Sequence, residues 1–191
     1  MKNASIIKRS ALVLAILGQA HIANAEDWTG SVALGLGSKE LDSRLWQRAD
    51  EQDSISLIAD IGKASWPVSI AVDLHGTGID KSDSADPYEG YTAELHLGVR
   101  RAWDIGGSGF QFYAGGGLAF GYAETKFGAN PELSGDGRGT GYWAGLGLRY
   151  RINQQFSVGT DFRYADFNIK HIDDSDTSGS RQFSITATYH W

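Results

Sequence analysis

Two short runs of the sequence place a carboxylate two residues before a histidine: Asp73 before His75, and Glu94 before His96. In an extended strand, residues i and i+2 point to the same side, so each histidine would lie beside its acid. Such a pair can transfer protons or contribute to a metal site. The same side chains are also expected among the polar groups of a protein interior, and no serine is clearly placed as a nucleophile. We therefore predict a structural role, with no catalytic residue, metal ligand or cofactor.

Other charged residues share the face of these histidines. On this face, carboxylates and arginines balance, four against four. Buried charges must be paired to be tolerated, which predicts a salt-bridge network that fills the interior. The alternative is a narrow ion path lined by the same groups, in space left by glycines or taken by Tyr113 and Trp143. The predicted interior set is Asp60, Asp73, His75, Glu94, His96, Arg100, Arg149, Arg151, Asp161 and Arg163.

The elements that carry these residues have a period of two. Eight segments alternate apolar with polar or small side chains, which is the pattern of β-strands with one apolar face. About ten residues are enough for a strand to cross a bilayer at a tilt. The segments are 28–37, 54–62, 68–75, 91–100, 110–122, 142–151, 156–164 and 183–191.

The connections between the segments alternate in length. Three short ones (63–66, 104–108 and 153–155) alternate with four long polar ones (38–53, 76–90, 124–139 and 168–181). Short periplasmic turns and long outer loops are the layout of an outer-membrane barrel. We therefore predict an all-β fold, an eight-stranded antiparallel up-and-down transmembrane β-barrel, with both chain ends at the periplasmic rim.

The distribution of aromatic residues indicates which face meets lipid. The charges lie on one face of the strands, whereas the other face is continuously apolar and has aromatic residues near both ends. Two aromatic girdles on the outward face mark the two membrane interfaces. The predicted girdle residues are Trp28, Trp103, Tyr150 and Trp191 at the short-turn rim, and Tyr91, Tyr122, Tyr142 and Tyr164 at the long-loop rim.

The N-terminal residues 1–25 have the features of a secretory signal peptide. A basic start precedes the apolar run 11–17, and the small-x-small run 23–25 follows it. Cleavage after Ala25 removes Lys2, Lys8 and Arg9 and changes the formal charge from −6 to −9. An acidic exported chain is a poor candidate for binding nucleic acid. The chain has no cysteine, so disulfides are excluded. The predicted barrel domain spans residues 26–191.

The run YWAGLGLRYRINQQFSVGTDFRYADF, residues 142–167, resembles the penultimate hairpin of small eight-stranded outer-membrane barrels. These are the OmpA-type transmembrane domain and the opacity-protein and OmpX-like group. The resemblance implies location in the outer membrane. It also implies that the closing strand with Trp191 is the signal for the barrel-assembly machinery. Because this group includes adhesins, porin-like proteins and enzymes, the resemblance does not select one function.

We predict a non-enzymatic, monomeric barrel that serves envelope integrity or surface interaction through its outer loops, in contact with outer-membrane lipid and lipopolysaccharide. A small channel is the alternative, and a lipid A-modifying enzyme is the third. The acidic loop runs 80–90 and 171–180 lack the spacing of an EF-hand, so we interpret them as solvated rather than calcium-binding. The loop with Leu41, Leu45 and Trp46 beside Arg44 and Arg48 could contact lipopolysaccharide phosphates or a partner, or pack on the barrel mouth.

Overall fold

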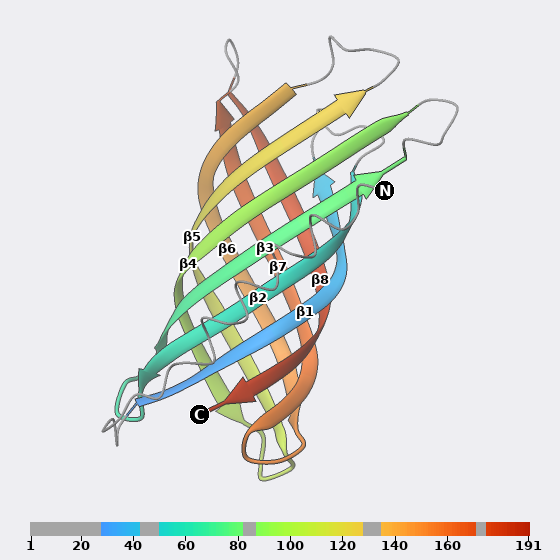
Figure 1. Ribbon diagram of the computed structural model, residues 1–191. Coiled ribbons are helices and arrows are strands. Elements are labelled where there is room, and N and C mark those ends of the chain that lie inside the picture. The colour runs from blue at the N-terminus through green and yellow to red at the C-terminus, as the bar shows by residue number, and fades with distance from the viewer. Residues whose placement is uncertain (1–27, 43–49, 82–86, 128–134, 171–174) are drawn as a thin grey trace.

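The computed structural model describes residues 28–42, 50–81, 87–127, 135–170 and 175–191 (Figure 1). The predicted signal peptide lies outside these residues. Within them, no helix has the length and hydropathy of a membrane span. The strands are β1 (Trp28–Asp42), β2 (Glu51–Lys63), β3 (Ser69–Asp80), β4 (Tyr88–Asp104), β5 (Phe110–Phe127), β6 (Gly135–Arg151), β7 (Phe156–Lys170) and β8 (Ser175–His190).

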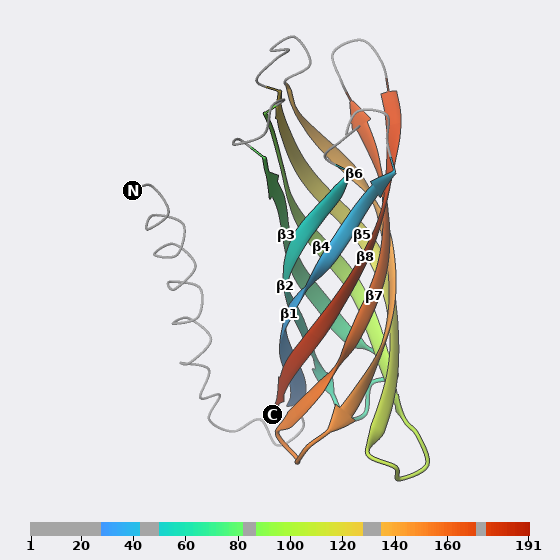
Figure 2. The same ribbon diagram turned by 90° about the vertical axis from the view of Figure 1, so that its right-hand side faces the viewer.

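The eight strands form one closed antiparallel barrel in which each strand pairs with its neighbours in sequence. The predicted fold is thus confirmed. β1 also pairs with β8, and the ring is closed to its last residue: Gly30 and Trp191 exchange two backbone hydrogen bonds of 3.2 Å each. Closure leaves no strand edge unpaired, which is the condition for a sheet to exist in hydrocarbon. Figure 2 shows β8 lying beside β1 along the length of the barrel.

The strands are longer than the sequence pattern suggested. Each has between 12 and 18 residues, so much of the four predicted long loops is strand. β1, for example, continues to Asp42, and its side chains keep alternating through Lys39 and Leu41, both buried. Beyond the bilayer, water surrounds the outer face. Polar residues can therefore point outward there, and the apolar alternation no longer marks the strand.

At the other rim the connections are tight, as predicted. They span residues 64–68, 105–109 and 152–155. In the second of these turns, Gly106, Gly107 and Gly109 have φ angles of 55°, 70° and 81°, a region that favours glycine. We assign this rim to the periplasmic side because short turns lie there in outer-membrane barrels.

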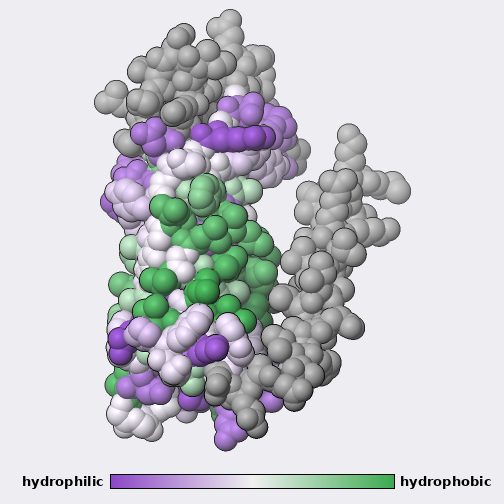
Figure 3. Space-filling model, turned by 90° about the vertical axis from the view of Figure 1, so that its left-hand side faces the viewer, coloured by the Kyte–Doolittle hydropathy of each residue, from purple (hydrophilic) through white to green (hydrophobic). Residues whose placement is uncertain are grey.

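The outer surface of the barrel is apolar at mid-height. Leucines, isoleucines and phenylalanines of all eight strands are exposed there, including Leu36 and Ile185 at about two-thirds exposure. On the face that Figure 3 shows, a hydrophobic region lies at mid-height below a hydrophilic outer end. A monomer in water does not expose so large a continuous apolar surface, whereas hydrocarbon requires it.

The aromatic residues of the outward face frame this band. Trp28, Trp103, Tyr150 and Trp191 are exposed at the turn rim, Tyr91, Tyr122 and Tyr142 are exposed nearer the outer end, and Tyr164 is half-buried. Twelve residues separate Tyr91 from Trp103 on β4. This is about 40 Å along the strand and about 30 Å along the barrel axis at the usual tilt, close to the thickness of the hydrocarbon core.

Candidate functional site in the barrel lumen

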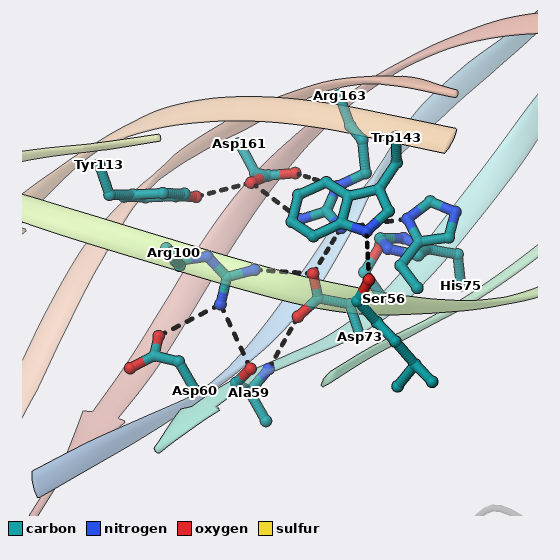
Figure 4. Close-up of polar contacts among 12 residues, drawn as sticks. Ser56, Ala59, Asp60, Asp73, His75, Arg100, Tyr113, Trp143, Asp161 and Arg163 are labelled. Atoms are coloured by element: carbon teal, nitrogen blue, oxygen red, sulfur yellow. Dashed lines mark hydrogen bonds and ion pairs between the residues drawn. The ribbon is translucent and has the colours of Figure 1, made fainter. Parts of the chain in front are cut away.

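Asp73 of β3 lies at the centre of the lumen and is fully buried. One of its oxygens accepts hydrogen bonds from Arg100 of β4 at 2.7 Å and from Arg163 of β7 at 2.5 Å. The other accepts the backbone N–H of Ala59 at 3.1 Å. These contacts join opposite walls of the barrel, as Figure 4 shows. Asp73 is therefore the residue on which the central network depends.

Two further carboxylates extend the network on either side. Asp161 accepts hydrogen bonds from Arg163 Nε at 3.3 Å and from the Tyr113 hydroxyl at 2.8 Å. Asp60 accepts one from Arg100 Nη1 at 3.2 Å, so Arg100 joins two acids (Figure 4). Arg149 Nη2 lies 4.0 Å from Asp60, at the limit of an ion pair.

The fourth acid, Glu94, pairs with a residue that the sequence analysis did not assign to the lumen. Glu94 accepts a hydrogen bond from Lys39 of β1 and lies 3.2 Å from His96 Nε2. Lys39 is 1% exposed. The sequence feature that places Lys39 in the lumen is the alternation of β1, in which Ser31, Ala33 and the following odd-numbered residues point inward. The prediction missed it because it ended the strand at residue 37.

Arg151, conversely, does not belong to the interior network. It is the last residue of β6 and lies at the periplasmic mouth, where its side chain is 43% exposed and 3.7 Å from Asp104. Its side chain points to the inner side of the strand, as predicted, but only Arg149, the inward residue before it, is buried. With Lys39 in its place, the charge balance within the lumen remains four acids against four bases.

Aromatic rings fill the space between the charged groups. Trp143 stacks on His96 with centroids 5.7 Å apart, and the Arg163 guanidinium lies 4.5 Å from its ring. Tyr113 lies 4.2 Å from the Arg149 guanidinium. Its ring rests on Gly147 so closely that a Cβ there would be 2.2 Å from the ring. Glycines of the wall thus make room for aromatic rings inside the lumen.

A small cavity lies above this layer, towards the outer end. Its volume is about 30 Å³, of the order of one or two water molecules. It is lined by Leu41, Phe167, Glu94 and several glycines of β5 and β6. Leu41 is buried against Ile79, Tyr88 and Ala123. Of the predicted loop cluster, only Leu41 lies within the described residues, and it packs inside the barrel mouth.

Of the two predicted acid–histidine pairs, only one is in contact in the structure. Glu94 and His96 are in contact, but Asp73 is held by arginines rather than by His75. His75 instead contacts Ser56 Oγ at 3.0 Å through Nδ1. Ser56 and His75 are both buried in the lumen. A second pair, Ser157 and His190 at 2.9 Å, lies near the periplasmic mouth, and its serine is also buried.

The lumen residues thus pair mainly with one another, through the hydrogen bonds and ion pairs described above. In the described part of the chain, no three His, Cys, Asp or Glu side chains are grouped so that they could hold a metal ion. The acidic runs considered for calcium, 80–90 and 171–180, lie partly outside it.

The outer rim is acidic on its outward face. Glu124 and Lys126 form a 2.7 Å ion pair, and the hydrogen bond from Lys126 lowers the pKa of the Glu124 carboxyl. Few other bases accompany the acids. Among the strand residues with described side chains, the outward acids of this rim are Glu40, Asp42, Glu51, Asp53, Asp80, Glu89, Glu124, Asp136 and Asp166, and the outward bases are Lys126, Arg138 and Arg181.

Solved structures of other barrels are similar to this chain. Neisserial surface protein A, NspA, is 14% identical, with a TM-score of 0.56 over 87% of this chain and 99% of its own. The attachment invasion locus protein Ail of Yersinia pestis, solved with the heparin analogue sucrose octasulfate, is 14% identical, with a TM-score of 0.58 over 86% and 99%. The N-terminal β-barrel domain of Pseudomonas aeruginosa OprF is 15% identical, with a TM-score of 0.51 over 84% and 97%. At such identities the likeness shows the fold alone.

No curated protein sequence matches this chain. Residues 10–190, however, match the sequence profile of the outer membrane protein beta-barrel domain. This match covers nearly the whole chain and agrees with the closed barrel, its apolar band and its aromatic residues. It also confirms the resemblance seen in residues 142–167. The chain belongs to the outer membrane β-barrel protein family.

Proposed function

We propose that the protein is a closed, non-enzymatic barrel of the outer membrane that serves envelope integrity or surface contact through its outer end. The observation that carries this proposal is the filled lumen. Asp73, Arg100 and Arg163 join opposite walls, and Trp143 and Tyr113 are buried between the charged groups. An eight-stranded barrel is only wide enough to be filled by side chains. Function then rests on the surfaces that the barrel presents.

The charge of the outer rim restricts the partners that suit it. Among the strand residues with described side chains, nine outward acids lie at this rim beside three outward bases. A polyanion such as the heparin analogue bound to Ail is therefore a poor match. We expect no retention on immobilised heparin at low salt. The acyl chains of lipopolysaccharide would contact the apolar band.

The two ends of the sequence bear on how the barrel is exported and assembled. We propose that residues 1–25 are removed after Ala25 and that the barrel is monomeric. The closing strand with Trp191 would be recognised by the barrel-assembly machinery. This proposal is supported by the exposed Trp191 ring at the periplasmic rim and by the pairing of the last strand with β1.

Ion current through the purified mature protein in planar bilayers tests the closed lumen. The wild type should give no stable conductance, whereas a stable, reproducible conductance would contradict the proposal. Cells that lack the protein should become more sensitive to detergents and bulky antibiotics, and the wild-type gene should restore resistance. A change in the lipid A mass spectrum between the two strains would instead support an enzyme.

A small channel is the second candidate, and one observation favours it. Several buried polar atoms of the lumen have no hydrogen-bond partner among the described residues, including Nε and Nη2 of Arg149 and the hydroxyls of Thr186 and Thr188. Buried polar groups of this kind are normally satisfied by water. Hydrated gaps could join into a path, and the current measurement decides between the two candidates.

A further inference from the structure

The periplasmic rim presents cations to the lipid, in contrast to the acidic outer rim. Two charged side chains point outward there, Lys63 at the end of β2 and Arg101 near the end of β4. The other described charges of this rim, Arg151 and Asp104, point to the barrel mouth and pair with each other at 3.7 Å. The three turns of the rim contain no charged residue. Among the described residues, the lipid-facing charge of this rim is therefore positive.

Each of the two cations is held over an indole ring. Lys63 is the cross-strand partner of Trp28, and its Nζ lies 5.3 Å from the Trp28 ring centre. Trp66 packs edge-on against Trp28 at 5.7 Å, and its backbone N–H donates to the carbonyl of Lys63 at 2.9 Å. The tight turn thus fixes the lysine and both indoles as one cluster.

Arg101 repeats the arrangement two strands away. It lies two residues before Trp103 on the same face of β4, and its guanidinium is 5.5 Å from the Trp103 ring centre. Trp103 stacks in turn on Phe112 of β5 at 5.7 Å. The arginine side chain therefore runs along the strand towards the rim, as cationic side chains do when they extend from hydrocarbon to the head groups. Indole rings prefer the same depth.

We infer that these two clusters bind anionic phospholipid head groups of the periplasmic leaflet. A cation at the head-group level, beside an indole that contacts the acyl boundary, is complementary to a lipid phosphate with excess negative charge. Attraction of one Lys or Arg to an anionic membrane surface is about 1 kcal/mol, or about five-fold in an equilibrium constant. This inference goes beyond the proposed outer-end function and does not depend on it.

The neighbours of the first cluster bear on the experiment. The sequence places Glu26 and Asp27 directly before β1, outside the described residues. Such acids could reduce the effect of Lys63. Arg101 is separated from β1 by β2 and β3, so it carries the decisive measurement.

The test compares folding in two kinds of vesicle. The mature protein, Lys63→Gln/Arg101→Gln, Arg101→Gln and Arg151→Gln are refolded into phosphatidylcholine and into phosphatidylcholine mixed with phosphatidylglycerol. Urea titration then gives the folding equilibrium constant at low salt. Arg151→Gln is the matched control, because it removes the same charge from the same rim but does not face lipid.

Phosphatidylglycerol should raise the folding equilibrium constant of wild type about five-fold more than that of Arg101→Gln, relative to phosphatidylcholine alone. The double variant should lose at least as much of this increase. High salt should remove the difference. Arg151→Gln should respond to phosphatidylglycerol as wild type does. Arg101→Lys keeps the charge and should keep the response, so it tests the inference even if the glutamine variants fold poorly. An unchanged response in Arg101→Gln, or an equal loss in Arg151→Gln, would overturn the inference.

Discussion

Removal of the Asp73 carboxylate should strongly destabilise the barrel. Asp73→Asn would leave Arg100 and Arg163 without the acid that neutralises both, in a site with no exposure to water. Breaking a buried ion pair from one side typically costs about 3–5 kcal/mol. Arg100 keeps Asp60, and Arg163 keeps Asp161. We therefore expect the free energy of unfolding to fall by about 3 kcal/mol, near the lower end of this range.

A double-mutant cycle separates this pairing from other effects of the substitution. The cycle combines Asp73→Asn with Arg100→Gln and measures the free energy of unfolding by urea titration of protein in vesicles. The 2.7 Å contact is a hydrogen bond between charged groups, worth about 1.5–3 kcal/mol, and the coupling energy should fall in that range.

The matched control is the exposed pair Arg151 and Asp104, whose atoms lie 3.7 Å apart. An exposed ion pair contributes about 0–1 kcal/mol, so its cycle should give little coupling. If the buried and exposed pairs gave equal coupling energies, the lumen would be well hydrated and the argument for a closed, paired interior would be refuted.

Leu146→Arg, which places a charge in the apolar band, should destabilise by about 2–4 kcal/mol, whereas Ser38→Arg on the same outward face near the outer end should have little effect in the same urea titration. Gly147→Ala should destabilise by about 1–3 kcal/mol, because its Cβ would meet a luminal ring at 2.2 Å; Gly76→Ala, whose nearest contact is 3.6 Å away, is the control. Deletion of Trp191 should lower the amount of barrel in outer-membrane fractions more than it lowers the stability of refolded protein, and normal membrane levels would contradict this.

The fold could be predicted from the sequence because it follows from a local pattern, the alternation of apolar and polar residues along each strand. A period of two assigns each residue to a face without knowledge of its neighbours in space. The apolar face, the aromatic residues near its edges and the short turns then distinguish a membrane barrel from a soluble one. Every charge that the structure places in the lumen lies on the predicted polar face, including Lys39, once β1 is extended.

The contacts within the lumen could not be predicted in the same way. Arg163 and Asp73 are 90 residues apart in sequence and meet across the barrel. Their meeting depends on the strand register and tilt, which a local pattern does not contain. Strand ends are similarly uncertain, because outside hydrocarbon the outward residues become polar and the contrast between faces is lost. For this reason the sequence pattern puts Lys39 in a loop and Arg151 in the interior, and the structure differs at both.

The charged lumen also bears on how one register is selected. A shift of one residue in strand pairing exchanges the two faces of a strand. For β4 it would move Glu94 and Arg100 from the lumen to the lipid, and for β7 it would move Asp161 and Arg163. A charged side chain on the lipid face costs up to about 2–4 kcal/mol at mid-membrane and less near the interfaces, so each such shift is disfavoured. Apolar side chains could fill the same volume, but both faces of each strand would then be apolar, and polarity would no longer select which face meets lipid. A buried network that adds little net stability can thus still be retained, because it fixes which side of every strand meets the membrane.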